Sequence, residues 1–219
     1  MRIVFAAVLA LATAAVRAEE LSVDPEAGNS TASAVFDARL GERIVAQSSS
    51  VGCEISYDGT AGTASGTCSV PLATIRVDNE PTKTEHFRQW VTNRKSDPET
   101  CRFEATFEGV KVGKLAPEAP APFEAEARFT VCGRRRADGG GEHVKGTAVL
   151  FPAGSYGKAR ALRVRATVTG FERDRYQIGP EYTEGWLARV QALARVVAQT
   201  GDIELTLFAR SKEGSAARR

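Results

Sequence analysis

Catalytic and metal-binding side chains are scarce in this sequence. Its 219 residues include two histidines, His86 and His143, one methionine and four cysteines. Neither histidine belongs to an HExxH motif or a nucleophile elbow, and neither has a metal-ligand spacing from a cysteine. Because no catalytic or metal site can be assembled from neighbouring residues, we expect neither enzyme activity, nor a metal, nor a resident cofactor.

Long apolar runs are missing beyond the N-terminus. Residues 1–18, MRIVFAAVLALATAAVRA, combine an early basic residue, an apolar stretch to about Val16 and small residues before Ala18. This pattern predicts a secretory signal peptide cleaved after Ala18, because the run is too short and too alanine-rich for a comfortable membrane span. We therefore expect an exported protein, periplasmic or secreted, with one domain over residues 19–219.

Neither sign of charge is in large excess. The full chain has 29 basic and 27 acidic residues, and the predicted signal peptide contains two of the basic ones, Arg2 and Arg17. The mature chain would then carry no formal net charge. Nucleic-acid binding depends on a broad positive field, so we expect no nucleic-acid partner.

The four cysteines predict two disulfides, since an exported chain meets an oxidising compartment. Folding the segment 53–72 about its glycine-rich turn near Thr60 places Cys53 opposite Cys68. The second pair, Cys101 with Cys132, is symmetric about the loop 113–120, although Cys132 is out of phase with the apolar residues that precede it.

A change of phase explains how the second pair can still meet. The apolar positions switch from Phe107 to Val110 and Val112 around Gly109. This predicts a β-bulge near Gly109, which would bring the second cysteine pair within about one residue of register.

Strict alternation of apolar and polar residues is the dominant pattern. Phe103, Ala105 and Phe107 alternate with charged or polar residues, and the segments 123–131 and 162–168 behave alike. Successive strand side chains point to opposite faces, so these strands would be apolar on one face and polar on the other. The pattern predicts an all-β, antiparallel, eight-stranded barrel with an apolar interior (the lumen) and one or two bent or split strands. We expect strands at 31–40, 43–49, 51–58, 66–77, 101–112, 123–132, 143–151, 160–171 and 202–210, after a short strand at the mature start.

Two segments have helical spacing instead. The segment from Thr82 to Arg94 starts with Thr82 and Glu85 in capping-box spacing and places Phe87 and Trp90 on one side. The segment from about 183 to 199 repeats apolar residues at Trp186, Val190, Leu193 and Val197. We expect both helices to cover a mouth of the barrel.

Five short stretches are spread along nearly the whole mature chain: the start LSVDPEAGNSTASAVFDA, then RVDNEPTKTEHFRQW, ETCRFEATFEGV, VTGFERDRYQIGP and the terminal GDIELTLFA. These stretches resemble the YceI-like family of secreted, polyisoprenoid-binding, lipocalin-like barrels. Arg173 and Tyr176 match the family's late signature, with Gln177 where glycine is usual. The four cysteines, the sequence from Cys132 to Arg136 and the long segment 181–199 depart from the family pattern.

The resemblance implies a protein that holds an isoprenoid or quinone-like lipid. Burying each methylene contributes about 0.8 kcal/mol, so ten offer about 8 kcal/mol before association costs of several kcal/mol. The family places the 82–94 helix beside a barrel opening, with His86 and Arg88 near the headgroup. Together with the alternation, this gives these candidate ligand residues in the lumen and entrance: Phe36, Phe87, Trp90, Phe103, Phe107, Phe129, Leu162 and Val164.

Several alternatives stay open. The run Arg134 to Arg136 is either a solvated loop or a docking site for a phosphate headgroup or anionic membrane surface. The barrel could instead be filled by its own aromatic residues and act as an interaction or stress-response module, or it could house an isomerase or hydrolase. A homodimer and a peripheral membrane contact are also left open.

Overall fold

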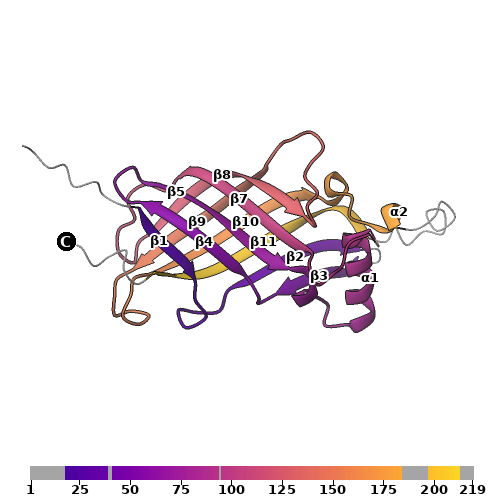
Figure 1. Cartoon of the computed structure of the whole chain (residues 1–219), viewed down its shortest axis with the longest axis horizontal. Helices are drawn as coiled ribbons and strands as arrows, with labels where there is room; N and C mark the ends of the chain where they lie inside the picture. The colour runs from indigo at the N-terminus through magenta and orange to yellow at the C-terminus, as the bar shows by residue number, and fades with distance from the viewer. Residues whose placement is uncertain (1–17, 39–40, 94, 184–196, 213–219) are drawn as a thin grey trace, which may run out of the picture.

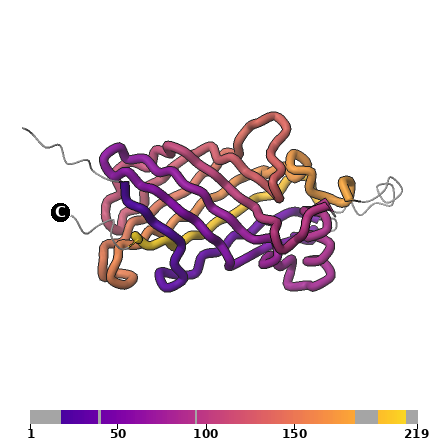
Figure 2. Tube along the Cα trace, in the orientation of Figure 1, coloured from indigo at the N-terminus to yellow at the C-terminus, as the bar shows by residue number. Residues whose placement is uncertain are grey.

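The computed structural model describes residues 18–38, 41–93, 95–183 and 197–212, which form a closed antiparallel β-barrel (Figures 1 and 2). Eleven strand segments build it. They are β1 (Glu19–Val23), β2 (Thr31–Ala38), β3 (Arg43–Ser48), β4 (Gly52–Asp58), β5 (Thr63–Pro71), β6 (Arg76–Val77), β7 (Arg102–Lys111), β8 (Pro120–Val131), β9 (Glu142–Phe151), β10 (Ala161–Glu172) and β11 (Val197–Ser211).

Three pairs of these segments act as single split strands, so the barrel has eight. Both β1 and β2 pair with β11, at Val23 with Ala209 and at Thr31 with Thr206. In the same way β4 pairs with β1 while β3 pairs with β2, and β5 and β6 pair with β4 and β3. The predicted antiparallel eight-stranded barrel is confirmed, with three split strands rather than the one or two expected.

The predicted bulge lies at Gly109. Strand β7 pairs with β5 at Phe107 with Gly66 and then at Val110 with Ala64, so one extra residue is inserted between these pairs. Gly109 has a φ of 61°, a conformation that glycine adopts without the steric cost of a side chain. Its N–H donates to Ser65 Oγ at 2.9 Å, which satisfies the group that leaves the ladder.

The first helix, α1 (Pro81–Thr92), starts one residue earlier than predicted. Its N-cap is Glu80, with no side-chain hydrogen bond, and Pro81 occupies the first turn, where a missing N–H costs nothing. The expected capping box of Thr82 and Glu85 is therefore wrong. Asn93 ends the helix in the left-handed conformation.

The second predicted helix is largely outside the described residues. A short helix, α2 (Pro180–Thr183), follows the 3-10 turn η3 (Arg173–Tyr176). Trp186, Val190 and Leu193 lie in the segment 184–196, which the structure does not describe. The expected extension to Gln199 is wrong, because Val197–Gln199 already belong to β11 and Val197 pairs with Ala38.

The two barrel ends differ. Helices α1 and α2 lie at one end, called here the α1 end, and the start of β1 and the end of β11 lie at the other (Figure 1). At the far end the β7–β8 loop is held in place by Tyr57, whose hydroxyl donates to Gly113 O and accepts from Leu115 N, both at 3.0 Å. None of the described helices is long and apolar enough to cross a membrane.

Both predicted disulfides are present, Cys53 with Cys68 and Cys101 with Cys132. The first joins directly paired residues of β4 and β5. The second needs a local adjustment, since the register of β7 and β8 aligns Phe103 with Val131 and leaves Cys132 one position away from Cys101. Cys132 leaves the strand with a φ of 46°, which turns its side chain toward its partner.

Candidate functional site

The lumen contains a cavity of about 340 Å³, within the range typical of small-molecule sites. Its wall takes apolar side chains from all eight barrel strands and merges two buried clusters of the core. Representative lining residues are Leu21, Ala34, Ile55, Val70, Ala105, Phe123, Ala148, Val168 and Leu207. The alternation seen in the sequence thus places an apolar surface inside the barrel, with little polar surface to interrupt it.

Three glycines keep lumen phenylalanine rings flat against the barrel wall. Each glycine is the direct cross-strand partner of one phenylalanine, and the ring lies over the place where a Cβ would be. The ring therefore occupies space that a larger residue would fill, so it takes up less of the lumen. The pairs are Gly66 with Phe107, Gly146 with Phe123 and Gly201 with Phe36.

The other predicted lumen residues also line this cavity. Phe103 stacks against Phe87 of α1 with ring centroids 6.3 Å apart, and Phe129 packs 6.1 Å from Phe171. Leu162 and Val164 project from β10 into the wall of the cavity. Their contact with a ligand stays a prediction.

Residues predicted to face water are exposed or half-buried. Glu104 and Arg165 are exposed, although Glu104 also borders the cavity. Arg163 is half-buried, and its guanidinium lies 5.6 Å above the ring of Phe151, outside the set of lining residues. The two-residue phase of β7 and β10 is therefore as the sequence predicts.

Helix α1 lies at the opening of the cavity. Lys83, His86, Phe87 and Trp90, spaced by about one helical turn, line the site, and His86 is exposed to solvent. The exposed His86 therefore places an opening of the cavity at the α1 end. Arg88, the second predicted headgroup contact, does not line the cavity, because its guanidinium donates to the carbonyl of Ala73.

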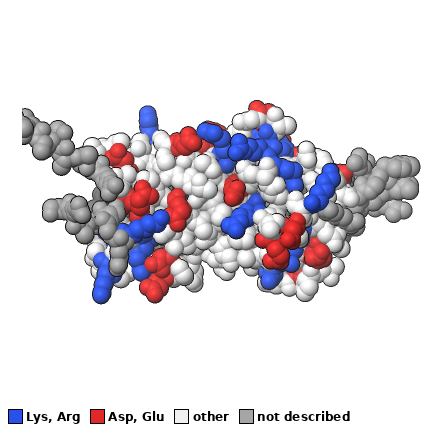
Figure 3. Space-filling view, in the orientation of Figure 1, with Lys and Arg blue, Asp and Glu red and all other residues white. Residues whose placement is uncertain are grey.

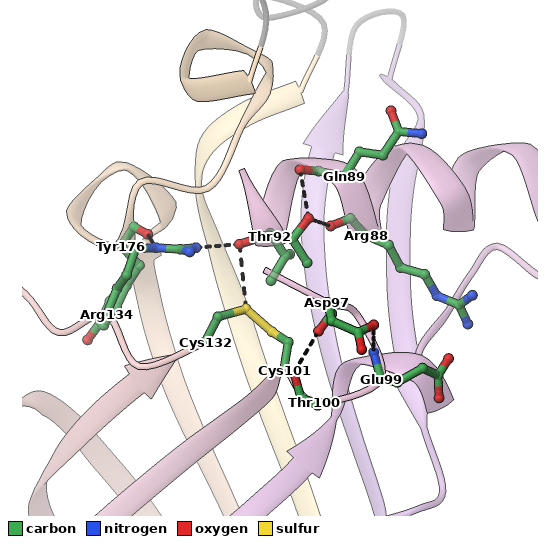
Figure 4. Close-up of a disulfide and its surroundings, with 11 residues drawn as sticks. Arg88, Gln89, Thr92, Asp97, Glu99, Thr100, Cys101, Cys132, Arg134 and Tyr176 are labelled. Carbon is green, nitrogen blue, oxygen red and sulfur yellow. Dashed lines mark hydrogen bonds between the residues drawn. A yellow bond between two sulfur atoms is a disulfide. The ribbon is translucent and has the colours of Figure 1, made fainter. Parts of the chain in front are cut away.

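The second disulfide and one arginine fasten the C-terminal end of α1 (Figure 4). Cys132 Sγ lies 3.7 Å from the carbonyl oxygen of Val91. Arg134 donates to that same carbonyl and, through Nε at 3.0 Å, to the carbonyl of Tyr176 in η3. Burial lowers the pKa of Arg134 from its ordinary value. This arginine links the helix at the opening to η3, which follows β10.

The arginine run is thus largely structural. Arg136 makes an ion pair at 2.6 Å with Asp138 and another at 3.2 Å with Glu142, and only Arg135 is exposed. The interpretation of the run as a solvated loop is wrong for Arg134 and Arg136. Sequence reasoning missed the role of Arg134 because its partners lie 42 and 43 residues away.

A buried arginine lines the cavity beside η3 and α2. Arg173 is 5% exposed and lies 2.6 Å from both Glu181 Oε1 and Ile178 O. Its Nε donates to Ala198 O at 3.2 Å. Burial and then a hydrogen bond with Glu181 raise the pKa of Asp174, whose carboxylate lies 3.9 Å from Arg173. In the sequence, Arg173 is marked only by its match to the late signature of the family that the chain resembles. No feature of the sequence marks Lys83 as a lining residue.

A buried tyrosine supports the wall next to Arg173. Tyr176 stacks on Phe171 with centroids 5.1 Å apart and donates to Glu142 Oε1 at 2.8 Å. Burial, followed by this hydrogen bond, raises the pKa of Tyr176 far above its ordinary value. Within the described part of the chain, no three His, Cys, Asp or Glu side chains are grouped so that they could hold a metal ion.

The architecture of this chain is similar to that of a known protein fold. No protein-family profile and no curated protein sequence matches the chain. Among solved structures it is similar to a polyisoprenoid-binding domain from Saccharophagus degradans implicated in plant cell wall breakdown, with a TM-score of 0.60 and 15% sequence identity over 88% of this chain and 98% of that one. The chain therefore has the fold of a polyisoprenoid-binding domain, a lipocalin-like barrel, as the resemblance of its short motifs predicted.

Proposed function

We propose that this protein is an exported, non-catalytic carrier that holds an isoprenoid or similar long apolar molecule in its lumen. The observation that carries the proposal is the enclosed apolar cavity, which takes side chains from every strand and opens beside α1. A fully self-filled barrel would leave no such space. The similarity to a polyisoprenoid-binding domain supports the same class of ligand.

The volume of the cavity indicates how much tail it can bury. If one methylene occupies about the volume of a water molecule in the liquid, about 30 Å³, then 340 Å³ holds on the order of ten such groups. Burying ten methylenes contributes about 8 kcal/mol before several kcal/mol of association cost is deducted. A chain of this size can therefore bind without a single hydrogen bond to the wall.

Export is supported by the two disulfides, which persist in oxidising compartments. A binding role without catalysis is supported by the side chains of the lumen. Among the described polar groups there, Arg173 and Tyr57 are engaged in hydrogen bonds that hold the barrel together. None of them is paired as a nucleophile with a base.

Organic extraction of the purified protein, followed by mass spectrometry, tests the proposal. We expect an isoprenoid-type or other long-chain lipid at up to one molecule per barrel, and uptake of a polyisoprenoid alcohol by lipid-free protein. The variant Phe107→Asp should lose uptake, because it places an unpaired carboxylate in the cavity.

The matched control is Glu108→Gln, which changes an exposed residue next to Phe107 on the same strand. It should bind like the unchanged protein. A folded barrel that contains no lipid and takes up no polyisoprenoid would contradict the proposal, as would full uptake by a folded Phe107→Asp variant.

A further inference from the structure

We propose that the site selects molecules with an uncharged head group, such as an isoprenoid alcohol or quinone, and discriminates against phosphate and diphosphate head groups. This inference rests on the proposed function, which concerns the apolar tail of the ligand, and extends it to the head group. It follows from the carboxylates that already pair with the positive charges lining the cavity.

The first cation at the opening, Lys83, is already neutralised. Its Nζ lies 2.9 Å from Asp78 Oδ2 and 3.1 Å from Glu80 Oε1. Hydrogen bonds that Lys83 donates to Asp78 and then to Glu80 raise the pKa of Lys83, so it remains a cation held between two carboxylates. Asp78 is itself fixed, since its other oxygen accepts the N–H of Val45 at 2.9 Å.

The second cation, Arg173, is enclosed by partners. It contacts the Glu181 carboxylate at 2.6 Å and two backbone carbonyls, and Asp174 lies 3.9 Å away. Its side chain is 6% exposed. A phosphate that took the place of Glu181 at Nη1 would leave that carboxylate near the cavity without its partner.

The cations that line the cavity are outnumbered by the carboxylates next to them. The two lining cations are accompanied by four carboxylates, those of Asp78, Glu80, Asp174 and Glu181. On the face shown in Figure 3 basic and acidic side chains are interspersed, so that face offers no broad positive surface either. Both described cations that line the cavity, Lys83 and Arg173, are thus already paired with carboxylates, and an anionic head group would meet like charge beside each of them.

A neutral head group fits better. His86 lines the opening, is exposed and has no partner among the residues that the structure describes. An imidazole can donate to a quinone carbonyl or accept from a hydroxyl, whichever tautomer is present. Beside it, Phe87 and Trp90 offer apolar surface for the first units of the tail.

Calorimetric titration with farnesol and farnesyl diphosphate tests this inference, because the two probes have the same tail. At moderate salt we expect the diphosphate to bind about tenfold more weakly than the alcohol, through repulsion by the carboxylates beside Lys83 and Arg173. Raising the salt concentration should narrow the gap, since salt screens exposed charges.

A charge variant tests the assigned cause. The double substitution Asp78→Asn with Glu80→Gln removes both partners of Lys83, and the asparagine oxygen can still accept the N–H of Val45. We expect the affinity for the diphosphate to rise about two- to fivefold relative to farnesol, the size of one partly exposed charge pair. The control Glu85→Gln removes a negative charge from the same helix without freeing Lys83, and it should leave the ratio of affinities unchanged.

The outcomes separate this inference from the proposed function. Equal or tighter binding of the diphosphate, or a double variant with an unchanged ratio of affinities, would overturn the preference for a neutral head group while a lipid carrier stands. If farnesol, farnesyl diphosphate and longer polyisoprenoids all fail to bind, the carrier function itself fails.

Discussion

The cross-strand pair of Gly146 and Phe123 allows one sharp prediction about how the lumen stays open. A Cβ on Gly146 would lie 2.5 Å from Phe123 Cζ, and it would also press on the backbone carbonyl of Arg165 in the neighbouring strand. The carbonyl belongs to the ladder of β9 and β10 and cannot move far. In Gly146→Ala the phenylalanine ring must therefore turn away from the wall and into the cavity.

The size of the effect follows from two opposing contributions. Overpacking costs about 1–3 kcal/mol in the free energy of unfolding. Replacing glycine by alanine in a strand raises the free energy of unfolding by about 0.5–1 kcal/mol, because the unfolded chain then has less conformational entropy. We expect Gly146→Ala to be less stable by about 0.5–2 kcal/mol and to bind a polyisoprenoid more weakly, because the ring takes up ligand space.

Urea unfolding and polyisoprenoid titration measure both effects. The matched control is Gly52→Ala, another strand glycine, whose Cβ would meet nothing closer than Ser69 Oγ at 3.5 Å. It should be neutral or slightly stabilising. Adding Phe123→Leu to Gly146→Ala should recover part of the loss, as a coupling between contacting residues. A Gly146→Ala protein as stable as Gly52→Ala, with unchanged ligand affinity, would refute the reasoning.

Three further predictions follow from the opening of the cavity. Arg134→Ala removes two hydrogen bonds to backbone carbonyls and should lower the unfolding free energy by about 1–3 kcal/mol in urea, whereas substitution of the exposed Arg135 by alanine should change little. Burial alone would raise the pKa of Asp78, but hydrogen bonds from the Val45 N–H and from Lys83 hold it below its ordinary value. The stability that this carboxylate contributes is present above about pH 4 and is lost as the pH falls below it, so thermal unfolding of Asp78→Asn should depend less on pH between 5 and 3 than that of the unchanged protein. In a Trp186→Phe background, the emission of Trp90 should shift when a polyisoprenoid binds, and Trp90→Ala should weaken binding; unchanged emission together with saturable binding would remove α1 from the entrance.

Features with a local signature could be predicted from the sequence. The alternation around Phe103 and Phe107 fixes which face is apolar, because the two-residue period depends only on the strand itself. The change of phase at Gly109 predicted the bulge for the same reason. The pairing of Cys53 with Cys68 needed only a hairpin register, and it is correct.

Features that depend on distant partners could not be predicted. Arg134 looks like part of a solvated run in the sequence, and only the packing of α1 against η3 shows that it joins the two. The glycine and phenylalanine pairs required the complete strand register, which local patterns do not provide. Lys83 has its acidic partners close in sequence, yet its position at the opening depends on how α1 docks on the barrel.

Photo-crosslinking with a polyisoprenoid that carries a diazirine near the end of its tail tests the central claim most directly. The account predicts saturable labelling of one tail per barrel, with the label on lumen residues such as Phe107, Leu162 and Val164, and competition by unlabelled polyisoprenoid. Labelling confined to outward-facing residues such as Arg165, or labelling that does not saturate, would contradict the claim that the lumen holds the tail.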